Sequence, residues 1–185
     1  MTTVFIGGSR HVSRLHADVK KRIDTIIEKS LPIVIGDANG ADKAVQTYLH
    51  HKNYRNVHVY CTENVCRNNV GAWLTHTVPA ATRERNAEFH SAKDRVMART
   101  ASVGLMIWDG KSIGTLLNVY RLLQDHKKAV VYNVPSGQFK EFRTETEWDI
   151  FLAACEEPVR VTAQQRVRTE PPRAPLTAQQ TALQL

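Results

Sequence analysis

The sequence predicts an α/β fold: a three-layer sandwich in which helices cover a mostly parallel sheet of about five or more strands. Runs rich in β-branched residues alternate with amphipathic helical patterns along the chain. Two of these runs are almost continuously apolar, which is typical of strands buried on both faces. Strands that alternate with helices of this length form βαβ units with right-handed crossovers.

Five β-rich runs predict the strands. The runs PIVIGD (32–37) and AVVYNV (129–134) have nearly continuous apolar residues. Such runs suit strands that are covered on both faces, as in a parallel sheet. The other strands are expected at 2–8, 56–61 and 102–109.

The helices are predicted from apolar residues that recur at helical spacing. In the first helical segment, Leu15, Val19 and Ile23 fall on one stripe and the charged residues fall on the other side. In the last segment, Trp148 and Leu152 have core-like spacing. The expected helices lie within 13–30, 41–52, 81–100, 112–128 and 144–157.

These elements predict one folded domain over residues 1–157. The segment 158–185 is rich in Pro, Gln, Thr and Arg, repeats TAQQ and has no apolar stripe. We therefore expect it to be a disordered or extended tail, suited to binding a partner protein.

The composition is that of an ordinary globular protein, with 42% hydrophobic residues in a chain of 185. The formal net charge of +7 favours a phosphate-bearing partner, although no block of basic and aromatic residues indicates a dedicated nucleic-acid surface. No apolar run is long enough to span a bilayer, and the N-terminus lacks a basic region before its apolar stretch. We expect a cytoplasmic protein without a membrane anchor. Its cysteines, Cys61, Cys66 and Cys155, lack metal-ligand spacing and are expected to be reduced thiols.

The turns after the strands carry the candidate chemistry, because ligands of open α/β sheets bind beyond the carboxyl ends of the strands. The first turn is GGSR (7–10), whose glycines let backbone amides approach a ligand closely. Ser9 offers a hydroxyl group, and Arg10 can form a bidentate contact with phosphate. The alternative is a tight turn with an exposed arginine.

The second turn is GDANGAD (36–42), which leads into a helix that begins near Ala41. The free N–H groups of a helix start form an anion site. Asp37 and Asp42 would repel a phosphate placed directly on them, so we expect them to accept hydrogen bonds from ribose hydroxyls or to cap the helix. The spacing matches neither the G-x-G-x-x-G fingerprint nor the P-loop, which disfavours a conventional NAD enzyme or an NTPase.

The fourth strand is followed by WDGKSIGT (108–115), another glycine-rich turn into a helix. Two such helix openings on one parallel sheet predict two flanks of one phosphate-accepting cleft. The preceding helix contributes KDRVMA (93–98), from which Arg95 could reach phosphate or base; the alternative is a solvated surface arginine. The scattered histidines predict no metal site, and no cofactor is expected.

With GGSR, GDANGAD, KDRVMA and WDGKSIGT in this order, residues 2–135 resemble the SLOG superfamily, and within it the small, single-domain YspA/YpsA-like branch. The superfamily includes the lysine-decarboxylase-like phosphoribohydrolases, which cleave the base from a nucleoside monophosphate. It also includes the DNA-processing protein of bacterial transformation and domains that sense ADP-ribose-like signals. The resemblance implies a Rossmann-like sandwich with a nucleotide-derived ligand over the carboxyl edge of the sheet.

The resemblance also implies which residues contact the ligand. The phosphoribohydrolases carry a catalytic glutamate three residues after their Gly-Thr, where this chain has Asn118, and an amide cannot act as a general base. The candidate catalytic residues are therefore Asp42, Asp94 and Asp109, with Asp37 and Glu84 as further carboxylates. The candidate ligand-binding residues are Gly8, Ser9, Arg10, Gly36, Asp37, Gly40, Ala41, Asp42, Arg95, Met97, Asp109, Gly110, Ser112, Gly114, Thr115 and Asn118.

Three functions remain open at this point. The first is a nucleotide N-glycosidase, in which a carboxylate stabilises the positive charge that develops on the ribose and Arg10 or Arg95 holds the 5′-phosphate. The second is a non-catalytic sensor of ADP-ribose-like nucleotides. Single-stranded nucleic-acid binding through the basic surface and the tail is a less favoured third. Related domains often pair through helices, so a homo-oligomer is a further expectation that no sequence feature fixes.

Overall fold

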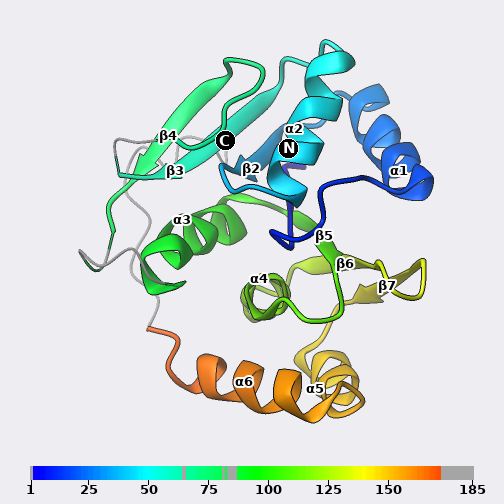
Figure 1. The fold of residues 1–185 in the computed structure, drawn as a ribbon, viewed down its shortest axis with the longest axis vertical. Helices are drawn as coiled ribbons and strands as arrows, with labels where there is room; N and C mark the ends of the chain where they lie inside the picture. Colours follow the sequence, from blue (N-terminus) through cyan, green and yellow to red (C-terminus); the bar gives the residue numbers. More distant parts are fainter. Residues whose placement is uncertain (1, 64–65, 81, 83–86, 172–185) are drawn as a thin grey trace.

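The computed structural model describes residues 2–63, 66–80, 82 and 87–171. They form one seven-stranded sheet of order β4-β3-β2-β1-β5-β6-β7 with helices on both faces (Figure 1). Every neighbouring pair is parallel except β6 and β7, which are antiparallel. The predicted α/β class and the mostly parallel sheet are confirmed.

Five strands overlap the predicted runs: β1 Val4–Gly8, β2 Ile33–Gly36, β3 Val57–Thr62, β5 Val103–Trp108 and β6 Lys128–Asn133. Two further strands were not expected: β4 Leu74–Val78 and β7 Gln138–Phe142. These two form the edges of the sheet, and most of their side chains are exposed or half-buried. Their polar composition therefore gives no apolar run for sequence patterns to detect.

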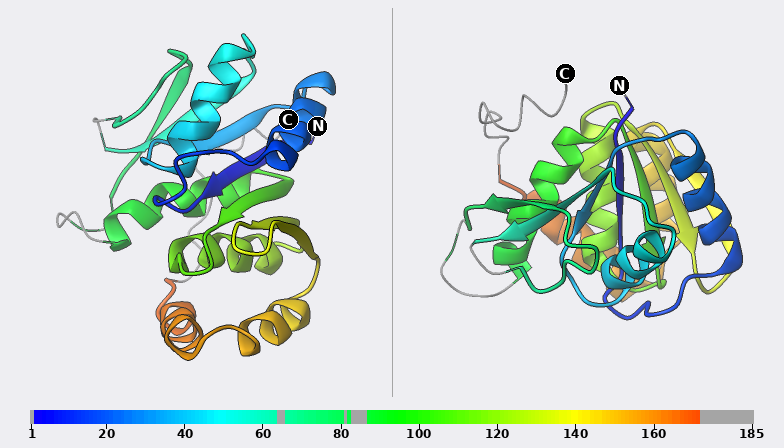
Figure 2. Two further views of the ribbon diagram at one scale, coloured as in Figure 1. Left: turned by 45° about the vertical axis from the view of Figure 1, so that its right-hand side comes forward. Right: turned by 90° about the horizontal axis from the view of Figure 1, so that it is seen from above.

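Helices α1 Ala17–Glu28 and α2 Ala41–His51 cover one face of the sheet, and α3 Ala87–Thr100 and α4 Ile113–Gln124 cover the other. Along the central strands β3, β2, β1, β5 and β6, side chains alternate between the two apolar clusters. In β1, Val4 and Ile6 pack with α1 and α2, whereas Phe5 packs with α3 and α4. Figure 2 shows α1 and α3 on opposite sides of the sheet.

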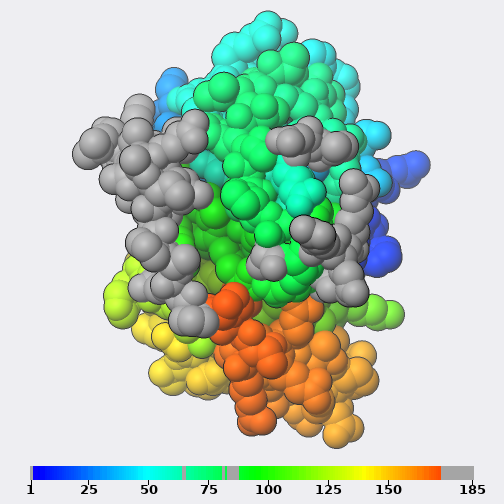
Figure 3. Space-filling view, turned by 90° about the vertical axis from the view of Figure 1, so that its left-hand side faces the viewer, coloured from blue at the N-terminus to red at the C-terminus, as the bar shows by residue number. Residues whose placement is uncertain are grey.

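Two more helices lie outside α4: α5 Glu145–Ala153 and α6 Glu157–Arg168 (Figure 1). Helix α6 buries Val159 and Ala163 in the same cluster as Trp148. In the space-filling view of Figure 3, its surface is continuous with that of the region around α3. The prediction of a disordered or extended tail from residue 158 is therefore wrong for 158–168, while residues 172–185 lie outside the described part of the chain.

The prediction that all cysteines are reduced thiols is also corrected. Cys61 and Cys66 form a disulfide, and Cys155 is free. The two bonded cysteines are separated by five positions at the end of β3, a local arrangement that their spacing alone did not reveal. No helix within the described residues is long and apolar enough to cross a membrane.

The strand order fixes where a ligand can bind. The chain proceeds from β1 outward to β2 and β3 on one side of the sheet, and β5 and β6 occupy the other side of β1. The connections that leave the carboxyl ends of β1 and β5 therefore diverge to opposite faces and leave a crevice between them. Open α/β sheets bind their ligands at this switch point.

Candidate functional site

A cavity of about 480 Å³ occupies this crevice. Its walls come from the turn after β1, from Ala38 and Asp42 at the start of α2, from α3, and from residues 111–115 at the start of α4. The glycine-rich turns at 36–42 and 108–115 thus lie on the same rim of the sheet. Of the sequence-predicted set, the cavity is lined by Gly8, Ser9, Arg10, Asp42, Asp94, Met97, Asp109, Ser112, Gly114, Thr115 and Asn118.

A second hollow of about 670 Å³ lies over the sheet face beside α1. Val4, Val103 and Lys128, the first residues of three strands, line it, so it lies at the opposite end of the strands from the crevice. Its floor is largely apolar. Ligand sites of α/β folds combine a carboxyl-end position with convergent polar groups, so the crevice is the candidate site despite its smaller volume.

The turn after β1 and the turn after β5 are joined through Ser9 and Asp109. Ser9 Oγ donates to Asp109 Oδ2 at 2.6 Å, and the backbone amides of Lys111 and Ser112 donate to Asp109 Oδ1 at 3.0 and 2.7 Å. Burial opposes the charge of Asp109, but these hydrogen bonds outweigh it and hold the pKa of Asp109 below its usual value. Asp109 is therefore ionised and anchors the turn after β5. Both of its carboxylate oxygens already accept hydrogen bonds.

The second turn packs directly on the first. Gly40 has a φ of 80°, and a side chain there would collide with the backbone of Arg10. The backbone amide of Ala41 donates to the carbonyl of Ser9 at 3.0 Å, and a Cβ on Gly8 would lie 2.8 Å from that of Ala41. Gly40 and Ala41 hold the turns together and do not line the cavity, so the prediction that they contact the ligand is not supported by their placement.

Gly36, Asp37 and Gly110 also lie outside the cavity lining. Gly36 ends β2 against buried charges, because a Cβ there would stand 2.5 Å from Asp42 Oδ2 and 2.7 Å from Lys93 Nζ. Asp37 accepts hydrogen bonds from Arg67, from the backbone amide at 3.0 Å and from Nη2 at 2.7 Å. Gly110 has a φ of 85° and faces Pro135.

Lys93 is the centre of a buried charge cluster at the base of the cavity. Its Nζ lies 2.7 Å from Asp94 Oδ1 and 3.9 Å from Asp37 Oδ1, and its side chain is 4% exposed. Burial opposes its charge, but the carboxylates of Asp94, Asp42 and Asp37 outweigh this and raise the pKa of Lys93. The sequence KDRVMA contains both Lys93 and Asp94, but the pattern alone did not single out the lysine.

Asp42 is the carboxyl group of this cluster whose pKa is raised, whereas the pKa values of Asp37 and Asp94 are lowered. Burial raises the pKa of Asp42 to about 7; Lys93 acts against the rise, and Asp94 adds to it. Asp42 Oδ2 accepts one hydrogen bond, from the backbone amide of Ala38 at 3.1 Å. Near neutral pH the group is therefore divided between its protonated and ionised forms.

Asn118 connects the cluster to the C-terminal helix region. Its Oδ1 accepts a hydrogen bond from Arg121 Nη1 at 2.7 Å, and its side chain also hydrogen-bonds Asp94. Arg121 in turn donates to Glu170 from Nε at 2.7 Å and from Nη2 at 3.0 Å. Asp94 is half-buried and burial opposes its charge, yet Lys93, Arg121 and Asn118 keep its pKa below the usual value. Local sequence patterns did not indicate this network, since Glu170 falls in the segment expected to be a tail.

Arg95 does not reach the cavity. Its Nε donates to Glu170 Oε1 at 2.8 Å, and its Nη2 lies 2.7 Å from Glu88 Oε1. The placement of Arg95 does not support the prediction that it binds the ligand, because the helix turns this side chain toward Glu170 and the residues after α6. The candidate acid Glu84, with Arg83 and Arg85, falls outside the described residues.

Three side chains that sequence analysis did not select, two arginines and a histidine, also line the walls. Arg67, His90 and Arg166 line the cavity, together with Arg10 and Lys111. Burial lowers the pKa of His90, and the neighbouring charges of Arg67, Lys93 and Arg10 contribute to the lowering. The depressed pKa of His90 is consistent with a positive potential over this part of the cavity.

Helix α4 begins at the cavity. Ser112 caps it by accepting a hydrogen bond from the Thr115 amide at 3.4 Å. The first amides of a helix have no carbonyl partner within the helix, so those of Ile113 and Gly114 remain available for an anion. A Cβ built on Gly114 would have no atom of the described residues within 4 Å outside its own helix backbone and chain neighbours. Open space therefore lies directly above this helix start.

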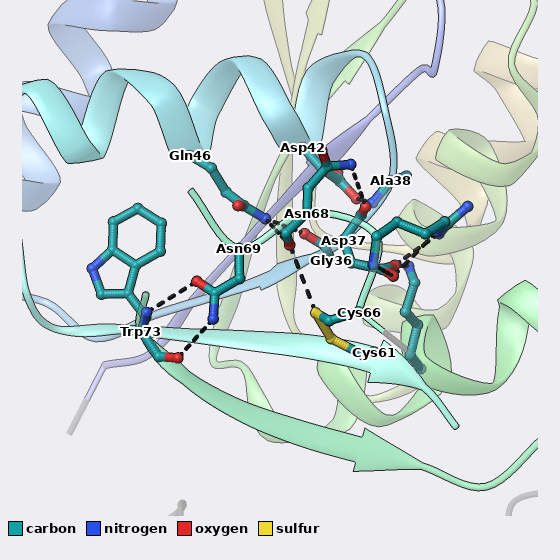
Figure 4. Close-up of a disulfide and its surroundings, with 12 residues drawn as sticks. Gly36, Asp37, Ala38, Asp42, Gln46, Cys61, Cys66, Asn68, Asn69 and Trp73 are labelled. Carbon is teal, nitrogen blue, oxygen red and sulfur yellow. Dashed lines mark hydrogen bonds and ion pairs between the residues drawn. A yellow bond between two sulfur atoms is a disulfide. The ribbon is translucent and has the colours of Figure 1, made fainter. Parts of the chain in front are cut away.

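One group of potential metal ligands occurs among the described residues: Asp37, Cys61 and Cys66, whose ligand atoms lie within 4.8 Å of one another. Figure 4 shows the two sulfur atoms bonded to each other beside the Asp37 turn. Disulfide sulfur is not a thiolate, and Arg67 already binds the Asp37 carboxylate. In this state the group does not fit a metal ion.

Comparison with protein-family models and with curated proteins found no match. Among solved structures, the chain is similar to DNA processing protein A from Helicobacter pylori, in a structure described as giving insight into that protein's single-stranded DNA binding mode. The TM-score is 0.55 at 15% sequence identity, over 91% of this chain and 81% of the other. The likeness shows that the two chains share a Rossmann-like fold.

Proposed function

We propose that the cleft binds the phosphate group of a nucleotide-derived ligand, and that this binding is its function. The observation that carries the proposal is the start of α4. This helix start faces a cavity at the switch point of the sheet, and open space lies next to its residue Gly114. Helix-start amides are favourable partners for a phosphate. Arg10, Lys111 and Arg67 add positive charge from three different segments around the same cavity.

Binding without hydrolysis, as in a sensor of ADP-ribose-like nucleotides, has more support than catalysis. A glycosidase needs an ionised carboxylate that is free to face the sugar. Asp109 is engaged by Ser9 and by two amides, and Asp94 is engaged by Lys93. Burial raises the pKa of Asp42 to about 7, so this carboxyl group is only partly ionised near neutral pH, and Asn118 is held by Arg121. Asp42 is the residue of choice if hydrolysis of a nucleoside 5′-monophosphate does occur.

Single-stranded nucleic acid is the second candidate ligand. The structurally similar DNA processing protein A binds single-stranded DNA, and the cavity of this chain has a cationic rim. When a protein contacts several phosphates of a nucleic acid, its affinity for that nucleic acid falls steeply as the salt concentration rises. Its affinity for a mononucleotide, which has one phosphate, falls only a little. Salt dependence thus separates the two candidates.

Calorimetric titration tests the proposal with adenosine 5′-monophosphate, adenosine, ADP-ribose and a short oligothymidylate. We expect the phosphorylated ligands to bind and adenosine to bind weakly or not at all. Arg10→Ala should weaken binding roughly tenfold, the loss of about one charge-assisted hydrogen bond. Arg14→Ala is the matched control, since Arg14 is exposed in the same connection and does not line the cavity. Equal affinities for adenosine and its monophosphate would contradict the proposal, and chromatographic detection of free adenine would reinstate the glycosidase.

A further inference from the structure

The segment that follows the disulfide forms one wall of the cleft. Arg67 comes directly after Cys66 and binds Asp37 through its backbone amide at 3.0 Å, its Nε at 3.1 Å and its Nη2 at 2.7 Å. The side chain of Arg67 also lines the cavity. A guanidinium group has five N–H donors, so the contacts with Asp37 leave Nη1 available for an anion.

Neighbouring residues attach the same segment to the second turn. Asn68 Nδ2 donates to the Asp37 carbonyl at 2.8 Å and to Asn39 Oδ1 at 3.0 Å. Gln46 of α2 bridges both sides: its Nε2 donates to the Gly36 carbonyl at 2.8 Å, and its Oε1 accepts from the Val70 amide at 3.0 Å. Figure 4 shows Asn68 between the Asp37 turn and the disulfide.

The disulfide is the covalent part of this attachment. It ties Cys66 to Cys61, which lies within β3 in the sheet and is 2% exposed. Because Arg67 directly follows Cys66, the disulfide holds the backbone of Arg67 close to the sheet. Asp37 holds its guanidinium group. Cys66 is half-buried, so its sulfur is the more accessible of the two.

We propose that Cys61 and Cys66 form a reversible thiol–disulfide site, and that its redox state controls how firmly Arg67 is held in the anion-binding cleft. The reductant is a dithiol. One of its thiolates attacks Cys66 Sγ, which breaks the bond to Cys61 and forms a mixed disulfide with Cys66; the Cys61 thiolate that leaves takes up a proton. The second thiol of the reductant then attacks the mixed disulfide and releases Cys66 as a thiol. The protein gains two electrons and two protons, and the reductant becomes a disulfide.

Reduction removes the covalent restraint but leaves the hydrogen bonds of Asp37 in place. We therefore expect the cleft wall to loosen locally, with β1 and β5 unaffected. The effect on ligand binding rests on the proposed function, whereas the redox step and the loosening do not. Their tests are separate for this reason.

The first test counts thiols. The protein is prepared in air, unfolded without reductant and treated with N-ethylmaleimide, and the modified peptides are mapped. Cys155 should be the one modified cysteine, and all three should be modified after treatment with dithiothreitol. Modification of Cys61 and Cys66 in the untreated sample would overturn the proposal.

The second test follows backbone amide exchange of the folded wild-type protein before and after dithiothreitol. Exchange should accelerate at residues 36–39 and 67–70 and stay unchanged in β1 and β5. Cys155→Ser is the matched control and should behave as the wild type. Cys61→Ser combined with Cys66→Ser should resemble the reduced wild type with or without reductant; if this variant does not fold, the reduced wild-type protein alone decides. Unchanged exchange at 36–39 and 67–70 on reduction would overturn the proposal.

The third test measures the affinity for adenosine 5′-monophosphate in both redox states. Reduction should weaken binding roughly tenfold, about the value of one charge-assisted hydrogen bond. In Arg67→Ala the two redox states should bind equally, because the residue that senses the disulfide is gone. An undiminished redox effect in Arg67→Ala would overturn the role of Arg67. Absence of binding in both states would refute the proposed function, while the exchange experiment would still decide the redox site.

Discussion

A Cβ atom at Gly36 would stand 2.7 Å from Nζ of Lys93. Strand β2 thus ends in glycine because a buried ammonium group from α3 occupies the space where a side chain would be. The charge of Lys93 offsets the charges of Asp94, Asp42 and Asp37. These acids come from α3, from α2 and from the turn after β2. The glycine and acids of the segment 36–42 and the lysine of KDRVMA are therefore parts of one arrangement.

Gly36→Ala should destabilise the protein by about 1–3 kcal/mol, as expected when an atom is added to a filled interior. The added methyl group must displace Lys93 or Asp42, and either shift weakens the buried ion pairs. Urea unfolding followed by circular dichroism measures the effect. A change below about 0.5 kcal/mol, the usual range for surface substitutions, would show that the charges are not packed against this glycine.

Gly114→Ala should separate stability from ligand binding. The methyl group meets no described atom within 4 Å outside the local backbone, and alanine favours a helix over glycine by roughly 0.5–1 kcal/mol. The free protein should therefore be as stable as the wild type or slightly more so. Binding of adenosine 5′-monophosphate should weaken, because the methyl group enters the space above the helix-start amides. Unchanged affinity by calorimetry would exclude a phosphate at this position.

Asp42→Asn should change how stability depends on pH. In the folded protein the pKa of Asp42 is about 7, against 3.8 for an ordinary aspartate. Between these values the folded chain keeps a proton that the unfolded chain has lost, so the stabilisation is fully present below pH 3.8 and is lost as the pH rises toward 7. The free energy of unfolding of the wild type, minus that of the variant, should fall across this window.

The difference between the two proteins is the informative quantity. Burial lowers the pKa values of His58 and His76, but both histidines are present in each protein, so their contribution cancels in the difference. Asparagine also keeps an oxygen that can accept the hydrogen bond from the Ala38 amide. Parallel stability curves for wild type and variant would mean that Asp42 is ionised throughout.

Glu170→Gln should destabilise the protein by about 3 kcal/mol or more, because Arg121 is buried and would lose its charged partner. Glu157→Gln is the matched control, since Glu157 is exposed at the start of α6 and should change stability by less than about 0.5 kcal/mol. Thermal unfolding of both variants measures the difference. Equal stabilities would show that the end of the described chain contributes nothing to the domain.

The sequence predicted the buried strands and the crevice because those features depend on local patterns. Continuous apolar runs identify β2 and β6, and a glycine-rich turn at a helix start makes α4 a candidate anion site. Helix α6 was missed because it buries only Val159 and Ala163, and two inward residues in a polar segment make no recognisable stripe.

Residues whose roles depend on distant partners could not be predicted from local patterns. Arg95 and Lys93 are neighbours in KDRVMA, yet only Lys93 lines the cavity, because Arg95 is drawn to Glu170. Arg67 enters the cleft through its contacts with Asp37, thirty positions earlier in the chain. Asn118 likewise links the buried charge cluster to Arg121 through its hydrogen bonds with Arg121 and Asp94. Its position three residues after a Gly-Thr pair does not reveal these contacts.

The most direct test of phosphate binding at the start of α4 is a titration of ¹⁵N-labelled protein, followed by the NMR shifts of its backbone amides. Adenosine 5′-monophosphate should shift the amides of residues 8–10 and 113–115 most strongly, and adenosine at the same concentration should leave them nearly unchanged. Shifts confined to the apolar hollow around Ile26 and Phe139, or equal shifts with both compounds, would contradict the account.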